Sequence, residues 1–351
     1  MLAPIIHYLP LTTIRRQRVL PANGRVLVHA GQKVSPTDVI AETSLTPQHA
    51  LLEVYRTLGL LPSQVDQYIQ AKMGDRVNKG DVIAGPVGVL SRVVHAPQDG
   101  KIVAIGEGQV LMELDSPAYQ LRAGLAGTVV DLVPERGAVI ETTGVLVQGV
   151  WGNDQADKSL LSVLSHSPED GLTAAQLDVS QRGAVVLSGV CPSEAALQAA
   201  IDLPLRGLIL GSMPSRLIPL AFKAPFPIIL IEGFGRMPMN QVAYTLLSTN
   251  EQREVIVNSL ACDRASGLRP EVVIPLPTGS PIPPPPETET FAPGQTVLIR
   301  RGGNAGQAGT LVSVKSEKTL FPSGVRASAG VVNLENGEHV TIPLANLEVI
   351  A

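Results

Sequence analysis

Short apolar segments separated by glycine-containing turns recur through the first 150 residues. Related segments begin at Asn23, Lys72, Asp99 and Ala126, and each joins β-branched residues through a turn that contains Gly or Gly with Asp. A period of two runs through Val26 and Val28 and again between 129 and 133, which is the spacing of strands with one buried face. The pattern predicts repeated β hairpins over residues 1–150.

One stretch of this first domain has helical spacing instead. Leu51, Leu52, Val54, Tyr55 and Leu58 recur at three- and four-residue intervals, Gly59 provides a stop, and a second short helix is expected from Pro62. We therefore expect a helical insertion at about 46–70.

The apolar pattern changes near residue 182. GAVVLSG, GLILGS and PIILIEGFG are continuous apolar runs, and a segment of helical character follows each one. Continuous apolar strands that alternate with helices indicate a parallel sheet covered on both faces. The pattern predicts an α/β domain with a parallel sheet over residues 151–277.

The last quarter of the chain contains a linker and a second β domain. Residues 278–290 include four consecutive prolines, which favour a semi-rigid polyproline II segment. Residues 291–351 predict four or five short strands with glycine-rich turns and a hairpin signal at Asn336-Gly337. The chain is therefore expected to be a multi-domain α+β protein.

Composition supports several small cores. A chain of 351 residues is longer than a domain with one ordinary hydrophobic core, so two or three domains are expected. The 33 Gly and 29 Pro suit the tight turns of small β barrels. The net charge of -4 gives no long-range attraction for nucleic acid or an anionic membrane.

The cysteine usage and the N-terminus indicate a cytoplasmic protein. Cys191 and Cys262 stand far apart without a partner pattern, which fits a reducing compartment. Apolar residues precede Arg15 and Arg16, the reverse of a secretory signal, and no apolar run reaches the roughly 18 residues of a membrane span. We therefore expect no membrane partner.

The string GDRVNKGDVIA from Gly74, followed by APQDGKIV from Ala96, resembles the barrel-sandwich hybrid fold of biotinyl and lipoyl domains. In these carriers, the modified lysine lies on the hairpin between the two halves of the pattern. The corresponding residues 85–94 contain no lysine, and Lys72 precedes the Gly-Asp turn on the wrong strand. Unmodified members serve as structural modules in redox subunits, efflux adaptors and RNA polymerase. The resemblance therefore implies a docking module without a covalent cofactor.

The C-terminal 60 residues resemble the KOW motif of the transcription factor NusG and some ribosomal proteins. The matching positions are Gly294, Val297, Ile299, Gly306, Gly309 and Leu311, with closing Pro343, Asn346, Leu347 and Glu348. The resemblance implies an SH3-like barrel that binds RNA or protein, with Arg300, Arg301, Lys315 and Lys318 as candidate contacts. Five basic residues against four glutamates in 291–351 favour protein docking, because few phosphates would be neutralised.

The loops of the α/β domain form a second candidate site. Each expected strand ends near glycine, and a proline follows at the expected first turn of the next helix, at Pro192, Pro214 and Pro238. In open parallel sheets, ligands bind outside the carboxyl ends of the strands, where helix N-termini favour anions. The candidate residues for a small anionic ligand are Ser188, Gly189, Gly211, Ser212, Glu232, Gly233, Gly235 and Arg236. Arg236 would supply a counter-charge and Glu232 would accept from a hydroxyl; alternatively, the glycines only make compact turns.

Other signals for chemistry are weak. The chain has no dinucleotide-binding or P-loop fingerprint, and its six histidines have no metal-ligand spacing. A helix start would lower the pKa of Cys191, but its context matches no cysteine-enzyme signature, and we favour a buried, inert thiol. No catalytic residue and no metal site are predicted.

The sequence therefore favours a non-enzymatic adaptor or accessory subunit that docks other macromolecules through its β barrels. One alternative is an enzyme or sensor that binds an anionic metabolite through the α/β loops. The other is a factor that associates with RNA polymerase or the ribosome through residues 291–351.

Overall fold

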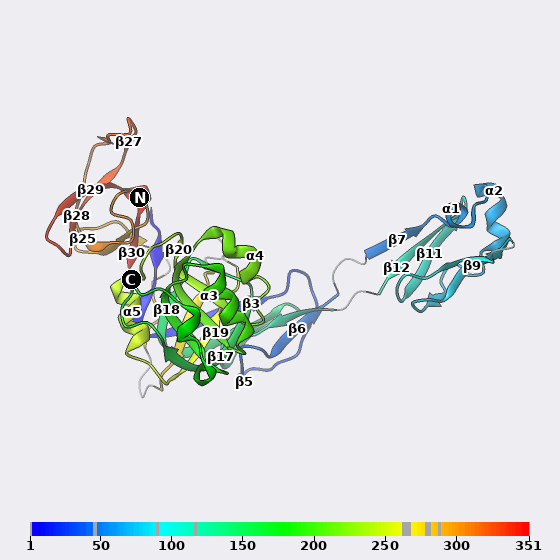
Figure 1. The fold of residues 1–351 in the computed structure, drawn as a ribbon, viewed down its shortest axis with the longest axis horizontal. Coiled ribbons are helices and arrows are strands. Elements are labelled where there is room, and N and C mark those ends of the chain that lie inside the picture. The colour runs from blue at the N-terminus through cyan, green and yellow to red at the C-terminus, as the bar shows by residue number, and fades with distance from the viewer. Residues whose placement is uncertain are drawn as a thin grey trace.

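The structure is a computed structural model that describes residues 2–44, 48–88, 91–115, 118–261, 268–277, 282–286 and 289–350. Strands predominate and form several sheets, while the helices are short. Within these ranges, no helix has the length and apolar character that crossing a bilayer requires. Figure 1 shows a large body and, at the far end of the molecule, a lobe that contains residues 48–114.

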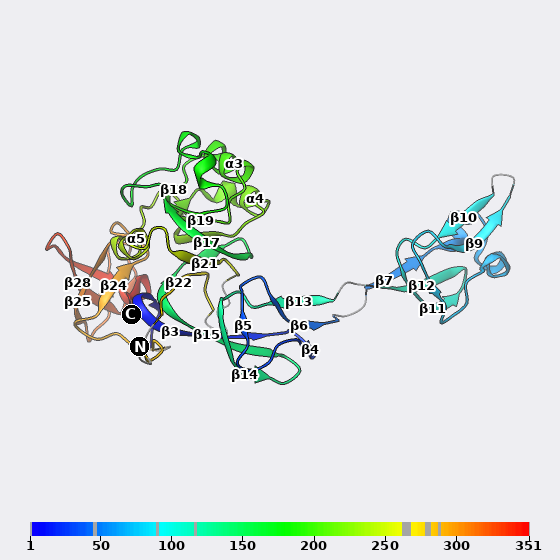
Figure 2. The same ribbon diagram turned by 90° about the horizontal axis from the view of Figure 1, so that it is seen from below.

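One eleven-stranded sheet runs through the body (Figures 1 and 2). Its order is β16–β20–β19–β18–β17–β21–β22–β15–β14–β5, and β3 also pairs with β15. The strands are β3 (Tyr8–Val19), β5 (Lys33–Val34), β14 (Gly127–Val133), β15 (Gly137–Gln148), β16 (Trp151–Gly152), β17 (Ala156–Val163), β18 (Val185–Val190), β19 (Gly207–Met213), β20 (Ile228–Phe234), β21 (Glu254–Asn258) and β22 (Glu271–Pro275). Because β15 pairs with β22, the sheet continues across the predicted boundary at residue 150.

The four strands β17 to β20 are parallel, and both of their faces are covered. Helix α5 (Gln241–Ser248) packs on one face, while α3 (Glu194–Asp202) and α4 (Ile218–Ala221) pack on the other. Three short 3-10 turns, η2 (Ala174–Gln176), η3 (Val179–Gln181) and η4 (Ser215–Leu217), join these elements. We call residues 151–258 the α/β unit.

The helices of the α/β unit begin later than the prolines predict. Ser193 is the N-cap of α3 and Asn240 is the N-cap of α5, because their side chains accept hydrogen bonds from the amides of Ala196 and Ala243. Pro192 and Pro238 therefore precede the caps, and Pro214 is the N-cap of η4.

The C-terminal unit, residues 289–350, is built around a six-stranded sheet ordered β2–β30–β24–β25–β28–β29. Its strands are β2 (Ile5–Ile6), β24 (Thr296–Ile299), β25 (Ala308–Val314), β28 (Ala329–Leu334), β29 (His339–Pro343) and β30 (Leu347–Ile350), with η5 (Leu344–Asn346) before β30. Two further pairs are β1 (Leu2–Ala3) with β23 (Glu289–Thr290), and β26 (Thr319–Leu320) with β27 (Arg326–Ala327). The first strands of the chain thus pair with its last strands.

The described part of the proline-rich segment lies against the start of β3. The hydroxyl of Thr13 donates to the carbonyl of Ile282 at 2.6 Å, and a ring nitrogen of His7 lies 3.2 Å from the carbonyl of Pro286. Residues 278–281 and 287–288 of the predicted linker lie outside the described residues.

The first 150 residues contain two copies of one β arrangement. We call the copy made of β3 to β6 and β13 to β15 the parent unit; its remaining strands are β4 (Arg25–Val26), β6 (Val39–Thr43) and β13 (Tyr119–Arg122). The lobe contains β7 (Gln48–Leu52), β8 (Arg76–Val77), β9 (Val82–Val87), β10 (Arg92–His95), β11 (Gly100–Gly106) and β12 (Gln109–Leu114). The lobe order β7–β12–β11–β8 repeats the parent order β3–β15–β14–β5.

Turn chemistry repeats as well. The carboxylate of Asp38 accepts from the amide of Ser35 at 2.8 Å in the parent unit, and Asp81 accepts from the amide of Asn78 at 2.7 Å in the lobe. The hairpins β6–β13 and β9–β10 are the corresponding pairs of the two copies. The short repeats in the sequence therefore belong to two copies of a single larger unit.

The lobe is inserted at the tip of the parent hairpin. Strands β6 and β13 pair as far as Thr43 with Tyr119, and the chain between these two residues makes the lobe. The corresponding position in the lobe lies between β9 and β10. In Figure 2 the parent unit lies between the lobe and the remainder of the body.

The helical insertion is shorter than its spacing predicts. Residues 48–52 form the edge strand β7, in which Leu51 and Leu52 pair with β12. Helix α1 (Val54–Leu58) ends at Gly59, which has a left-handed φ of 73°, and α2 (Pro62–Val65) and η1 (Asp66–Tyr68) follow. Pairing with β12 overrides the helical spacing of the two leucines.

The duplication predicts which glycines tolerate a side chain. A Cβ on Gly100 would lie 2.2 Å from the carbonyl oxygen of Glu113, and a Cβ on the corresponding Gly127 would lie 2.3 Å from that of Glu141. We expect Gly100→Ala to destabilise the lobe by about 1–3 kcal/mol, because backbone of the paired strand must move. Urea denaturation of the full chain measures the change.

Gly106, at the other end of β11, is the matched control, because a Cβ there meets nothing within 4 Å. Gly106→Ala is expected to leave the free energy of unfolding of the lobe within about 0.5 kcal/mol of the wild-type value. Equal effects of the two substitutions would contradict the close approach at Gly100.

Candidate functional site

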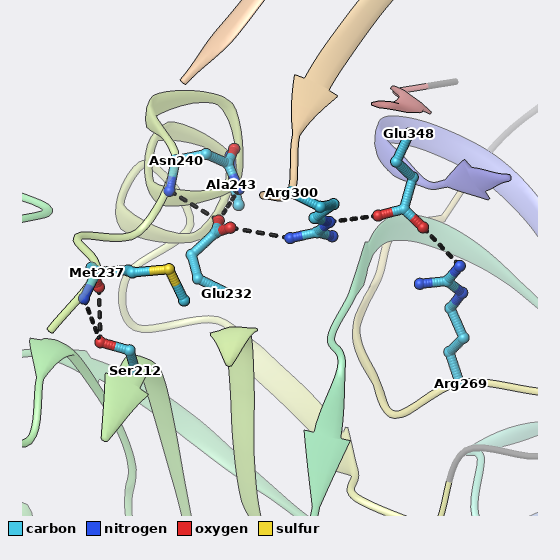
Figure 3. Close-up of polar contacts among 8 residues, drawn as sticks. All are labelled: Ser212, Glu232, Met237, Asn240, Ala243, Arg269, Arg300 and Glu348. Carbon is cyan, nitrogen blue, oxygen red and sulfur yellow. Dashed lines mark hydrogen bonds and ion pairs between the residues drawn. The ribbon is translucent and has the colours of Figure 1, made fainter. Parts of the chain in front are cut away.

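The three loops at the carboxyl ends of the parallel strands lie together, as the candidate ligand site requires. Ser212, at the end of β19, donates through its hydroxyl to the carbonyl of Met237 at 2.7 Å and accepts from the Met237 amide at 2.9 Å (Figure 3). The amide of Cys191 donates to the carbonyl of Ser212 at 2.9 Å. The loops are therefore held directly to one another.

The glycines of these loops permit close backbone packing. A Cβ on Gly189 would lie 2.4 Å from the carbonyl oxygen of Asp170, and a Cβ on Gly211 would lie 2.9 Å from that of Gly189. Gly233 and Gly235 have φ values of 122° and 127°, which residues with a side chain rarely adopt. Close approach of neighbouring backbone therefore accounts for Gly189 and Gly211, and the positive φ accounts for Gly233 and Gly235.

Amide groups that an anionic ligand would need already have partners within the chain. The Gly235 amide donates to the carbonyl of Met213 at 2.9 Å, and the Met239 amide donates to that of Pro168 at 3.3 Å. Ser188 is buried on β18, whereas Arg236 is exposed beyond β20. The candidate residues are thus neighbours that differ in burial.

Glu232 is buried at the end of β20, where it holds the start of α5. Its carboxylate accepts from the backbone amide of Asn240 at 3.0 Å and from the Asn240 side-chain amide. Asn240 in turn accepts from the amide of Ala243 at 2.8 Å and so caps the helix (Figure 3). The carboxylate therefore has a structural partner on the loop where a ligand hydroxyl was predicted.

The second oxygen of Glu232 bonds to Arg300 of the C-terminal unit, at 3.0 Å. The Nε of Arg300 donates to Glu348 on β30, and Glu348 accepts from Arg269 at 2.6 Å. We call these four residues the charge chain (Figure 3). Arg300 therefore lies between two carboxylates, and its side chain is mostly buried.

Burial determines the electrostatics of the charge chain. The side chains of Glu232 and Glu348 are 1% and 7% exposed, and that of Arg300 is 19% exposed. Burial disfavours the charged form of Arg300 and so lowers its pKa, but the neighbouring oxygens of Tyr8, Glu348 and Glu232 outweigh this effect and raise the pKa above its ordinary value. Burial also raises the pKa of Tyr8, which is therefore neutral.

Sequence reasoning found two members of the charge chain as members of two separate sites. Glu232 was assigned to the α/β loops and Arg300 to the C-terminal barrel, and their contact spans 68 residues of sequence. Arg269 and Asn240 were missed. The available signal was a glutamate inside an apolar strand, at PIILIEGFG and at LEVI, since a buried carboxylate requires a partner.

The remaining basic candidates of the C-terminal unit are Arg301, Lys315 and Lys318, and all three are exposed. Within the described ranges, no group of three or more His, Cys, Asp and Glu residues is arranged to hold a metal ion. No family model matches the chain, and no curated protein matches it significantly.

Loss of the guanidinium at residue 300 is expected to destabilise the protein strongly. Arg300→Gln leaves two buried carboxylates with a weaker donor, and breaking a buried ion pair costs about 3–5 kcal/mol. Thermal and urea unfolding measure the loss. The neighbouring Arg301→Gln removes the same charge from an exposed side chain, and a shift within about 0.5 kcal/mol is expected. Similar losses in both variants would contradict a specific role for Arg300.

Cys191 is expected to be unreactive in the native protein. The residue is buried, and burial raises the pKa of its thiol to about 11. In a Cys262→Ser background, labelling with Ellman's reagent at pH 8 should be at least about 100-fold slower than for a thiol of ordinary pKa, and should become fast in urea. Rapid labelling of the folded protein would contradict the burial of this thiol.

Proposed function

We propose that this protein is a non-enzymatic adaptor or accessory subunit that docks other macromolecules through its β units. In this proposal the parent unit and the lobe are two barrel-sandwich hybrids, and the C-terminal unit is an SH3-like barrel. The observation that most supports this proposal is the insertion of the lobe at the tip of the β6–β13 hairpin, at the far end of the molecule from both termini (Figure 1).

The position of the lobe leaves apolar side chains and a strand edge exposed, which supports a docking role. Within the described residues, its sheet ends in the edge strand β7, whose Leu51 is 56% exposed, and Leu61 and Met73 are also mostly exposed. Large exposed apolar side chains and free strand edges are features of interaction surfaces. Because the lobe is inserted at the tip of the β6–β13 hairpin, it presents these features away from the body.

A second surface of the body has the composition of an interface. Trp151, the only tryptophan of the chain, makes edge contacts with Phe222 and Phe234, each with ring centroids 5.6 Å apart. Phe222 is 54% exposed and Phe234 is 39% exposed. Because aromatic side chains dominate binding energy at protein interfaces, we call these three residues the aromatic patch and include it among the proposed docking surfaces.

Removal of the lobe tests the proposal. Thr43 and Tyr119 are paired, so a two-residue Asn-Gly turn can replace residues 45–117 and close the parent hairpin. We expect this variant to fold and to lose at least one partner that cross-links to the full chain in its native cell. Quantitative mass spectrometry of photo-cross-linked complexes compares the two proteins.

A Phe222→Ala, Phe234→Ala variant assigns partners to the aromatic patch in the same way, and Leu132→Ala removes an exposed leucine of the parent unit as the matched control. An identical set of partners for the full chain, the lobe deletion and the patch variant would contradict the adaptor proposal.

Association with RNA polymerase or the ribosome through Arg301, Lys315 and Lys318 is the alternative function. In that case, replacing all three residues by Gln should abolish co-sedimentation with ribosomes.

A further inference from the structure

A small cavity lies where the parent unit meets the end of strands β21 and β22. Its volume is about 30 Å³, and its polar lining comes from Arg16 and Arg18 on β3, Asn258 at the end of β21, and Arg269 and Glu271 at the start of β22. Leucine and alanine side chains form the remaining wall. Among the described residues, three arginines and one glutamate therefore border the same space.

Among the described residues, carboxylates pair with two of the three arginines around this cavity. Arg16 binds Glu271 through both carboxylate oxygens, with its Nε 3.0 Å from each. Arg269 is bound to Glu348 at 2.6 Å. Among the described residues, Arg18 has no ion-pair partner, and its Nε donates to the backbone carbonyl of Arg122 at 3.3 Å. Its other guanidinium donors remain available at the cavity.

Asn258 adds a neutral donor. Its carbonyl oxygen accepts from the backbone amide of Leu260 at 3.3 Å, so its amide nitrogen is the group left to interact with a ligand. Asn258 is only 6% exposed. A guanidinium and an amide nitrogen on the same cavity are the donors that protein sites use for carboxylate and phosphoryl oxygens.

The size of the cavity limits the ligand. One water molecule needs about 10–15 Å³ of such space, so the cavity admits a group with about two small oxygen-bearing positions. A carboxylate, with two oxygens, meets this limit, whereas a phosphoryl group, with three terminal oxygens, would place only part of itself in the cavity.

We propose that this cavity binds a small oxyanion, a carboxylate or a phosphoryl group, through Arg18 and Asn258. The site is distinct from the α/β loops and does not depend on the adaptor role. Arg18 is a half-buried cation; burial lowers its pKa, while Glu271, Tyr119 and Asp154 raise it in part, so a bound anion would add to the compensation that these groups give.

Binding is tested on the full-length protein with inorganic phosphate and, separately, acetate, at constant ionic strength set by chloride. We expect a saturable rise in Tm with at least one anion and a matching isotherm in calorimetry. A response to acetate alone identifies a carboxylate site, and a response to phosphate alone identifies a phosphoryl site. No saturable response to either anion overturns the proposal.

Two substitutions distinguish anion binding in this cavity from nonspecific attraction by other positive charges of the protein. Arg18→Gln should weaken binding by about 10-fold or more, because a charge-assisted hydrogen bond is lost, while Arg122→Gln removes a nearby exposed charge and should change binding less than about twofold. Equal binding by the wild type and Arg18→Gln overturns the assignment.

Asn258→Asp provides a test that does not require Arg18 to be replaced. The new carboxylate has nearly the same shape and supplies the anion from within the chain. This variant should therefore unfold at a higher Tm than the wild type without added anion, and should no longer respond to phosphate or acetate. A lower Tm together with an unchanged anion response contradicts the proposed site.

Discussion

Arg300 stands between Glu232 and Glu348, and each of these carboxylates is almost completely withdrawn from water. Exposing any member alone would leave a buried charge without compensation, which is among the most costly changes that a folded protein can undergo. The α/β unit, which contributes Glu232, is therefore bound to the C-terminal unit, which contributes Arg300 and Glu348. Arg269 extends the same chain of charges to the start of β22.

Apolar packing reinforces this connection. Ile6, Val147, Val185 and Leu298 belong to one buried cluster, although they come from the first strands, the parent unit, the α/β unit and the C-terminal unit. A core shared in this way has no internal boundary along which the units can slide. The body therefore behaves as one packed structure, in which strands from both ends of the chain are neighbours.

The lobe, in contrast to the body, has a core of its own. It repeats the strand order and the Asp-containing turns of the parent unit, yet its core cluster contains only residues between 52 and 114. The parent copy contributes β15 to the large sheet, whereas within the described residues the corresponding β12 of the lobe pairs with β7 and β11 alone. One β arrangement thus serves once as a component of the body and once as a self-contained module, which is the physical basis of the adaptor proposal.

Charge also explains why the oxyanion site is inferred away from the loops where the sequence predicted an anion. At the carboxyl ends of the parallel strands, the backbone amides bond to neighbouring loops and Glu232 bonds to Asn240 and Arg300. Beside β3, the described lining of the cavity includes three ion-paired or half-buried arginines and one glutamate.

Local patterns in the sequence determined much of the secondary structure. The hairpins of the first 150 residues and the parallel strands with their helices follow from periodicity and turn residues that act over about ten positions. Signals of this range also identified Gly59 as a helix end and placed Glu232 and Ser212 near the ends of neighbouring strands. The two leucines of β7 were misassigned, because pairing with a strand almost sixty residues later outweighs helical spacing.

Only the tertiary structure decided which of these elements share a sheet, a core or an ion pair. The nested position of the lobe depends on the pairing of Thr43 with Tyr119, and the contact of Glu232 with Arg300 joins residues that no periodicity relates. Neither appears in a local pattern, because the free energy of such contacts arises from burial that exists only when distant segments meet. Apolar spacing and turns specify elements, whereas shared burial specifies their partners.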